Sequence, residues 1–260
     1  MTTHPFLLQA MAQSALDLAC SPDDFTKSEN VVVESKKTEG AHVYFEQPFL
    51  CNVTSYGKNA VASVKTGYHE KVKAFLDAFP TAHLFETPAI YALNEIFREE
   101  DSRVCFLAEF FLPDPEKLSP LPTDFEIKRI EQKDFLPLYL PEWSNALCKD
   151  RKELDRVGFG AFDEKGNLIG FAACSEDCAS MWQIGVDVLP PFRGRGIASA
   201  LTSRLALEIL RRGKIPFYCA SWCNLASVRN ALRSGFFPAW TEMTVKSNQT
   251  VSSFLPESFR

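Results

Sequence analysis

The stretch from Val186 to Ala198 joins a predicted strand directly to a predicted helix through a loop of glycine and arginine. It reads Val-Asp-Val-Leu-Pro-Pro-Phe-Arg-Gly-Arg-Gly-Ile-Ala, and apolar residues then recur every four positions at Ile197, Leu201, Leu205 and Ile209. That spacing is typical of a helix that packs one face on a sheet. A strand that runs straight into such a helix is typical of an α/β fold, so this stretch limits the fold class before any other feature does.

The same loop has the properties of a phosphate-binding site. The first turn of a helix leaves backbone N–H groups unpaired and carries the positive end of the helix dipole. Gly194 and Gly196 let an anion approach the backbone, and Arg193 and Arg195 add positive charge. The chain lacks G-x-x-x-x-G-K-[ST], and Ser199 stands where G-x-G-x-x-G needs its third glycine, which disfavours nucleoside triphosphates and dinucleotides. The alternative interpretation is a solvated surface turn.

Two motifs in sequence order point to a known family. Arg193–Ala198 fits the pattern R-x-x-G-x-A, with Val188-x-Pro190-x-x-Arg193 as its lead-in. Further along, Asn224-x-x-Ser227 opens a predicted helix that ends at Ser234-Gly235-Phe236. In this order the motifs resemble those of the GNAT superfamily of N-acetyltransferases, over about residues 124–248. The resemblance implies an α/β (α+β) fold with a mixed, mostly antiparallel sheet flanked by helices.

The resemblance also implies acetyl-coenzyme A (acetyl-CoA) as the cofactor and a place for it. The predicted strands at Val186–Val188 and Ile215–Ser221 would splay apart, and pantetheine would lie in the gap. Pyrophosphate would rest on the backbone N–H groups from Gly194 to Ser199. Asn224 and Ser227 would contact the pantetheine arm, although Asn224 is equally suited to be a helix N-cap. The expected cofactor-binding residues are Val186, Val188, Arg193, Gly194, Arg195, Gly196, Ile197, Ala198, Ser199, Asn224 and Ser227.

The catalytic positions depart from the family pattern. Many members carry a tyrosine four residues before the Gly-Phe pair and a glutamate on the strand before the coenzyme loop, where this chain has Ala231 and Gln183. Asp187 shares a strand face with Gln183, so it is a candidate base, with a solvent-facing or salt-bridged aspartate as the alternative. Tyr218 or its neighbour Cys219 must face the cleft, and Tyr218 is the candidate acid.

A proline-rich segment divides the chain. Residues 113–123 contain four prolines and are predicted to be an extended connector between an N-terminal α/β auxiliary domain, residues 1–112, and the catalytic domain, residues 124–260. Strands are predicted in the N-terminal domain at Val31–Glu34, Phe49–Ser55 and Val104–Phe111. Helices are predicted to start at Ser21-Pro22 and Thr87-Pro88 and to cover Glu70–Ala78. A degenerate GNAT-like copy that has lost the coenzyme loop is one interpretation of this domain.

The catalytic domain is predicted to alternate strands and helices around the loop. Strands are expected at Phe125–Ile130, Arg156–Phe162, Leu168–Cys174 and Ser180–Val188, with a turn at residues 163–167 between the second and third. Residues Lys133–Leu147 are expected to be helical in part, with interruptions at Pro137 and Pro141. Two short strands, Phe236–Trp240 and Thr241–Lys246, are expected to end the fold.

Composition excludes several kinds of protein. The net charge of −5 argues against nucleic-acid binding, and no apolar run reaches the ~20 residues that cross a bilayer. The beginning of the chain does not resemble a secretory signal, so a cytoplasmic location is expected. Cys174-x-x-x-Cys178 and Cys219-x-x-x-Cys223 could in principle bind zinc, but reduced thiols without a metal are expected.

The sequence therefore predicts an acetyl-CoA-dependent N-acetyltransferase acting on a primary amine of a small molecule or peptide, with no nucleic-acid or membrane partner. Two alternatives stay open. The first is a coenzyme A-binding or sensing protein without turnover, because Gln183 and Ala231 replace the usual proton-transfer residues. The second is an enzyme that uses a longer acyl-CoA, which depends on the space around Phe159, Phe171 and Cys174.

Overall fold

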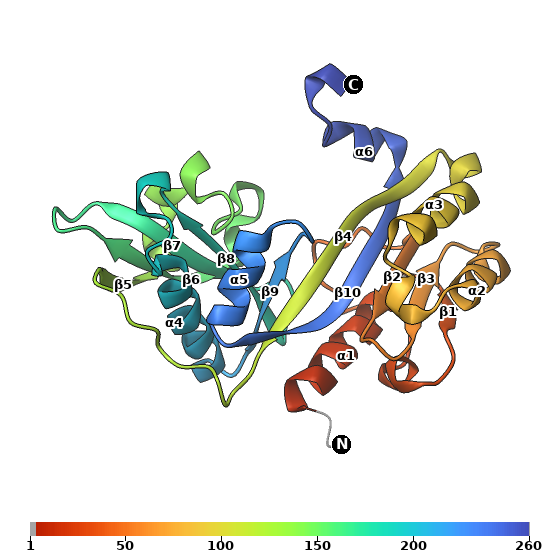
Figure 1. Ribbon diagram of the computed structural model, residues 1–260, viewed down its shortest axis with the longest axis horizontal. Coiled ribbons are helices and arrows are strands. Elements are labelled where there is room, and N and C mark those ends of the chain that lie inside the picture. The colour runs from red at the N-terminus through yellow and green to blue at the C-terminus, as the bar shows by residue number, and fades with distance from the viewer. Residues whose placement is uncertain (1–3, 260) are drawn as a thin grey trace. The chain divides into compact units, whose positions relative to one another are not determined.

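The computed structural model describes residues 4–259 and divides into two compact units (Figure 1). Unit 1 consists of the chain up to Glu109 together with the chain from Ala239 onward, and unit 2 is Phe110–Pro238. The expected boundaries at residues 113–123 differ from this division, because they assign the whole C-terminal end to the second half. The chain returns to unit 1 since its last strand, β10, pairs with β2 from Thr241↔Ser55 to Val245↔Cys51.

Unit 1 is an α/β unit whose strands follow the order β1-β3-β2-β10-β4. β1 and β3 are parallel, whereas β3–β2 and β2–β10 are antiparallel. Its elements are α1 (Pro5–Leu18), β1 (Val31–Glu34), β2 (Cys51–Ser55), β3 (Ala60–Val64), α2 (His69–Ala78), α3 (Thr87–Ile96), β4 (Ser102–Pro113), β10 (Phe236–Ser247) and α6 (Asn248–Ser253). Sequence reasoning missed α1 and β3. The start predicted at Ser21-Pro22 exists, but it opens a short 3-10 helix, Pro22–Thr26, closed by a Ser21–Asp24 capping box.

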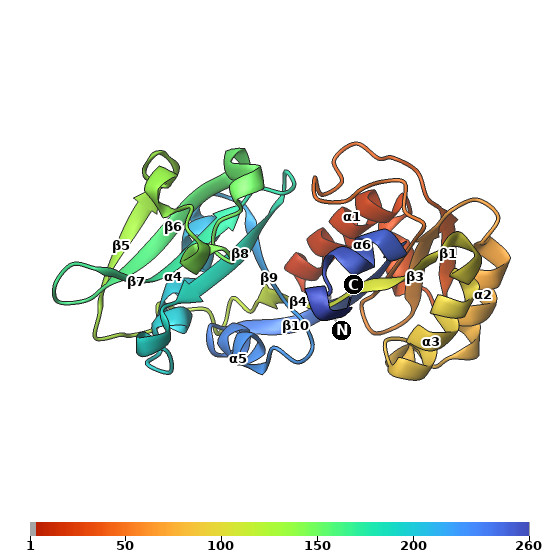
Figure 2. The ribbon, with the colours of Figure 1, turned by 90° about the horizontal axis from the view of Figure 1, so that it is seen from above.

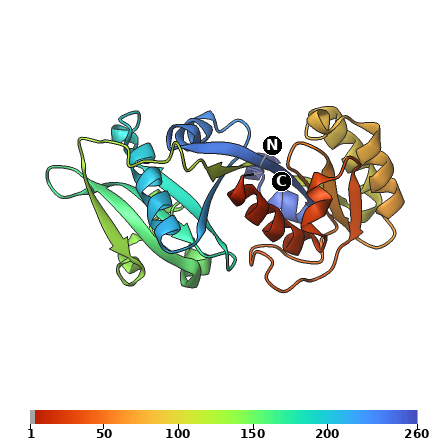
Figure 3. The same cartoon turned by 90° about the horizontal axis from the view of Figure 1, so that it is seen from below.

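Helices cover both faces of the unit 1 strands. Ala60 and Ala62 of β3 lie in one buried cluster with α2 and α3, whereas Val61, between them, lies in another with α1. Because successive side chains of a strand point to opposite faces, α1 and the α2–α3 pair lie on opposite sides (Figures 2 and 3). This double cover explains why every residue of β2 and β3 is buried.

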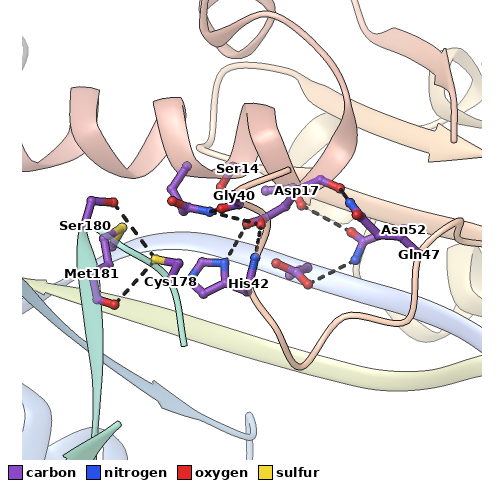
Figure 4. Close-up of polar contacts among 12 residues, drawn as sticks. Ser14, Asp17, Gly40, His42, Gln47, Asn52, Cys178, Ser180 and Met181 are labelled. Atoms are coloured by element: carbon purple, nitrogen blue, oxygen red, sulfur yellow. Dashed lines mark hydrogen bonds and ion pairs between the residues drawn. The ribbon is translucent and has the colours of Figure 1, made fainter. Parts of the chain in front are cut away.

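A buried polar network fixes the loop that precedes β2 (Figure 4). Asp17 of α1 accepts hydrogen bonds from the backbone N–H of His42 at 2.8 Å and from the Gln13 side chain at 3.2 Å, and its second oxygen lies 2.8 Å from His42 Nδ1. Gln47 donates to the Asp17 backbone carbonyl. Burying a carboxylate is costly unless it is paired in this way, so the network holds residues 40–47 against α1.

Unit 2 contains a mixed, mostly antiparallel sheet in the order β9-β8-β7-β6-β5, as the sequence predicted. The pairs from β5 to β8 are antiparallel, and β8–β9 is parallel. Its elements are β5 (Glu126–Glu131), β6 (Asp155–Phe162), β7 (Leu168–Ser175), β8 (Met181–Val188), α4 (Ile197–Arg211), β9 (Ile215–Ala220) and α5 (Leu225–Arg233). In the described part of the chain, no helix is long and apolar enough to cross a membrane.

The partial helix expected at residues 133–147 takes the form of short 3-10 helices, Gln132–Asp134, Leu136–Leu138 and Pro141–Trp143. Closely spaced prolines prevent a longer run of i→i−4 hydrogen bonds. One predicted feature of the second half is corrected. The two terminal strands expected at Phe236–Trp240 and Thr241–Lys246 are one continuous strand, β10.

The two faces of the unit 2 sheet have different covers. Ala172 of β7 belongs to the cluster formed with α4, whereas its neighbours Phe171 and Ala173 pack with residues 135–147. α4 lies across β6, β7 and β8 on the first face (Figure 1). The segment 132–147 therefore covers the second face.

Candidate functional site

The parallel pair β8–β9 stops partway along both strands. Its register runs from Met181↔Ile215 to Ile184↔Tyr218, while β8 continues to Val188 and β9 to Ala220. Beyond Ile184, β8 stays paired with β7 up to Gly170↔Val188. β8 therefore leaves β9 and follows β7, so a gap opens along its last residues, including Val186 and Val188. Backbone groups that face this gap are placed to pair with an extended ligand.

The first turn of α4 lies directly after the end of β8. Gly194 and Gly196 have φ values of +76° and +77°, a left-handed conformation that favours glycine. A Cβ at either position would meet no protein atom within 4 Å, so the space in front of both is open. The backbone N–H of Ala200 donates to Gly196 O at 3.0 Å, and the N–H groups of Ile197, Ala198 and Ser199 therefore have no acceptor inside the helix.

Two exposed arginines flank this turn and are held by neighbouring groups. Arg193 Nε donates to the Val188 carbonyl at 2.9 Å, which ties the loop back to the end of β8. The Arg195 guanidinium lies over the Phe125 ring, with its Cζ 4.5 Å from the ring centre. Both contacts keep positive charge beside the open glycines, where the helix dipole also favours an anion.

Gly170 is a residue of this site that sequence reasoning missed. A Cβ at Gly170 would come within 2.7 Å of Ile197 Cγ2 and 3.3 Å of Leu201 Cδ1. Because Gly170 of β7 has no side chain, the first turn of α4 can lie close against the sheet. A glycine inside an apolar strand is the only sequence signal that could have indicated it.

The second predicted motif forms the opposite border of the gap. Asn224 Oδ1 accepts the backbone N–H of Ser227 at 3.2 Å, so Asn224 has the N-cap role that was one of its two interpretations. The Ser227 hydroxyl pairs with the Tyr218 hydroxyl at 2.7 Å. Burial raises the pKa of Tyr218, so this phenol keeps its proton at neutral pH.

The two candidate catalytic residues lie on opposite faces of the sheet. Tyr218 belongs to the cluster on the α4 face, which also contains Ile184. Asp187 projects from the other face, where its carboxylate accepts three hydrogen bonds from residues 145 and 146. These donors are backbone N–H groups and an amide, so Asp187 is neither the solvent-facing nor the salt-bridged aspartate of the alternative interpretation, and its role as a base stays a prediction. The structure does not bring Asp187 and Tyr218 together as a pair.

Gln183 lies on the same face as Asp187. Its side-chain amide donates to Cys219 Sγ at 3.0 Å, across the part of the sheet where β8 and β9 are still paired. Ala231, at the position where the family pattern has tyrosine, is a fully buried residue of α5. Neither residue has a group that accepts or donates a proton in catalysis.

The chain matches a known family over most of its length. The model of the GNAT acetyltransferase family covers residues 46–239, about three quarters of the chain. This match begins well before residue 124, where the resemblance based on the two motifs begins. It therefore includes much of the N-terminal half of the chain. A comparison with curated protein sequences finds no significant match.

Several solved structures are distantly similar. A GCN5-related N-acetyltransferase-like protein from Streptococcus suis is 21% identical, with a TM-score of 0.43, over 62% of this chain and 69% of that one. A putative GNAT-family acetyltransferase from Novosphingobium aromaticivorans is 20% identical, with a TM-score of 0.40, over 56% and 66%. A Drosophila protein is 13% identical, with a TM-score of 0.47, over 93% and 88%. The family model, which spans both halves of the chain, is therefore the match on which family membership depends.

Proposed function

The chain belongs to the GNAT acetyltransferase family, and from this premise we propose that it is an acetyl-CoA-dependent N-acetyltransferase that acts on a primary amine of a small molecule or peptide. One observation carries the proposal. The gap between β8 and β9 opens beside the first turn of α4, with its open glycines and N–H groups without helical acceptors. This arrangement suits a ligand with an extended amide-containing arm and a diphosphate.

The residues of the site fit coenzyme A. The diphosphate would accept hydrogen bonds from the N–H groups at 197–199, in the open space before Gly194 and Gly196. Arg193 and Arg195 would contribute charge from positions that the Val188 carbonyl and the Phe125 ring already fix. The pantetheine arm would pair with the backbone near Val186 and Val188, and α5 with Ser227 would border its other side.

Acetyl-CoA supplies an activated acetyl group: the amine nitrogen bonds to the acetyl carbon, the carbon–sulfur bond breaks, and one proton passes overall from nitrogen to sulfur. The chain's own contribution is to hold both reactants and to handle that proton. We assign the proton donor for the leaving sulfur to Tyr218, because its phenol is protonated and Ser227 holds its hydroxyl at the border of the gap. General acid catalysis contributes ~10²–10⁴-fold where proton transfer limits the rate.

Calorimetry with coenzyme A and a thiol-release assay with acetyl-CoA test the proposal. We expect binding at one site and release of free thiol with at least one amine from a panel of amino acids, polyamines, aminoglycosides and peptides. Binding without thiol release from any amine would favour the second candidate, a coenzyme A sensor, which Gln183 and Ala231 motivate. Faster release from a longer acyl-CoA would favour a different donor, and no binding at all would refute both functions.

A further inference from the structure

A short segment, residues 144–147, is fastened to the face of β8 that points away from α4. It follows the 3-10 helix Pro141–Trp143 and is called here the docked segment. Asn145 donates its backbone N–H to Asp187 Oδ2 at 2.9 Å and its side-chain amide to Oδ1 at 2.6 Å. The backbone N–H of Ala146 donates to Oδ2 at 3.0 Å. Charge-assisted hydrogen bonds of this kind are stronger than neutral ones, and three of them converge on one carboxylate.

Gly185 makes the close approach of this segment possible. A Cβ at Gly185 would lie 1.8 Å from the carbonyl oxygen of Asn145 and 2.7 Å from its carbonyl carbon. Both are backbone atoms, so a side chain at this position would displace the docked segment itself and not only a flexible side chain. Glycine at 185 and aspartate at 187 thus act on the same segment from successive positions on one strand face.

Apolar contacts hold the other side of the docked segment. Ala146 and Leu147 are buried with Trp143 against Phe171 and Ala173 of β7. Ser144 and Asn145, in contrast, are exposed. The segment is therefore anchored by its apolar residues to β7 and by Asn145 and the backbone N–H of Ala146 to Asp187 of β8, while Ser144 is exposed.

The docked segment lies where an acceptor would approach. Gly185 and Asp187 are in the part of β8 that no longer pairs with β9, so they border the gap. The anion site of α4 belongs to the opposite face of the sheet, to which Val186 and Val188 also turn. If the coenzyme binds on the α4 face of the sheet, the amine can approach from the opposite face, which carries Asp187.

We propose that Asp187 is a positioning residue, which with Gly185 fixes the docked segment as one wall of the acceptor site and thereby sets the approach of the amine. The inference rests on the proposed acetyltransferase function. If this is correct, a variant with a loosened docked segment should have a lower kcat/KM for the amine and an unchanged affinity for coenzyme A. A 1 Å displacement of a positioned reactant can cost ~10²-fold in rate.

The chain offers a matched control for Asp187. Asp163, in the turn between β6 and β7, accepts the same kinds of bond: the backbone N–H groups of Lys165 and Asn167 and the side-chain amide of Asn167. Asp187→Asn and Asp163→Asn therefore remove the same charge from similar bonds, but only the first lies beside the gap. Gly185→Ala is the second variant, and Gly160→Ala in β6 is its control, because the three atoms nearest to a Cβ there belong to the side chains of Leu168, Ile130 and Phe162 and not to backbone.

Three measurements on the full chain test the proposal: hydrogen exchange of the peptide that contains Asn145 and Ala146, coenzyme A affinity by calorimetry, and kcat/KM for the best amine of the panel. We expect Asp187→Asn and Gly185→Ala to speed exchange in that peptide and to lower kcat/KM for the amine by roughly 10–100-fold. The dissociation constant of coenzyme A should change less than about twofold, and both controls should behave like the wild type.

Each other outcome overturns part of the argument. Unchanged exchange in both variants would show that Asp187 and Gly185 do not fix the segment. Faster exchange with an unchanged kcat/KM would show that the segment is no part of the acceptor site. A loss of coenzyme A affinity as large as the loss of kcat/KM for the amine would indicate that Asp187 belongs to the coenzyme site. A wild type that binds no coenzyme A would refute the proposed function, while the exchange result would still decide whether Asp187 anchors the segment.

Discussion

Placing a negative charge at Gly196 is the sharpest test of the coenzyme loop. Gly196 has a φ of +77°, and a Cβ there would contact nothing within 4 Å. A side chain at this position therefore costs backbone strain of about 1–2 kcal/mol but no steric clash within the protein. Asparagine and aspartate have nearly the same shape and differ in charge. The comparison of Gly196→Asn with Gly196→Asp thus isolates the effect of charge on the bound anion.

The size of that effect follows from Coulomb's law. Two unit charges about 5 Å apart repel by about 1–3 kcal/mol when the effective dielectric constant lies between ~80 and ~20. The dissociation constant of coenzyme A should therefore be about 5- to 150-fold higher for Gly196→Asp than for Gly196→Asn. At ~1 M salt the Debye length falls to about 3 Å, and the difference between the two variants should shrink.

Gly166 supplies the control for strain. It has a φ of +80° and, like Gly196, no protein atom within 4 Å of a Cβ, but it lies in the β6–β7 turn. Gly166→Asp should lower the thermal stability about as much as Gly196→Asp and leave the calorimetric affinity for coenzyme A unchanged. A folded Gly196→Asp protein that binds coenzyme A within twofold of Gly196→Asn would refute the assignment of the diphosphate to this loop.

Three further outcomes follow from single contacts. Tyr218→Phe removes the hydroxyl that pairs with Ser227 and should lower kcat by about 10–100-fold with little change in coenzyme A affinity; an unchanged kcat in the thiol-release assay would exclude Tyr218 as the acid. Burial raises the pKa of Glu242 from 4.5 to about 7, so the native state binds its proton more tightly and the free energy of unfolding should fall as pH rises from about 4.5 to about 7. Glu242→Gln keeps an acceptor for Asn52 but cannot titrate. In urea unfolding, the free energy of unfolding of this variant should therefore fall less steeply with pH over this range than that of the wild type. Leu201→Ala removes a fully buried side chain of α4 and should lower the free energy of unfolding in urea by about 2–5 kcal/mol, whereas a cost below ~1 kcal/mol would contradict its core placement.

Features encoded within a short stretch of sequence were predictable. The helix α4, its glycine loop and the preceding strand lie in one continuous run, Met181 to Arg211, and periodicity with glycine placement was enough to predict them. The strands Val31–Glu34 and Leu168–Ser175 were likewise found within a residue or so of their bounds. In each of these cases the local pattern and the tertiary environment favour the same structure.

Features that depend on distant partners were not predictable. Asp187 and its donor Asn145 are 42 residues apart, and nothing in the strand pattern distinguishes a carboxylate that fastens a loop from one that faces solvent. The return of the chain to unit 1 depends on pairing between Thr241 and Ser55, which no local signal encodes. Residues 132–147 form 3-10 turns because of their prolines and their packing on β7, although their composition suggests partial helix.

For the proposed acetyl transfer, the arrangement of the site favours positioning over proton transfer as the larger contribution to the rate. Gln183 and Ala231 offer no titratable group, the carboxylate of Asp187 already accepts three hydrogen bonds, and Tyr218 lies on the other face of the sheet. General acid or base catalysis by one residue supplies ~10²–10⁴-fold, or about 3–5 kcal/mol, whereas holding two reactants in register can supply ~7–11 kcal/mol. If the enzyme depends mainly on the second effect, Gly185→Ala should lower kcat/KM for the amine more than Tyr218→Phe does. The opposite order in the same assay would show that proton delivery by Tyr218, and not the docked segment on β8, limits the reaction.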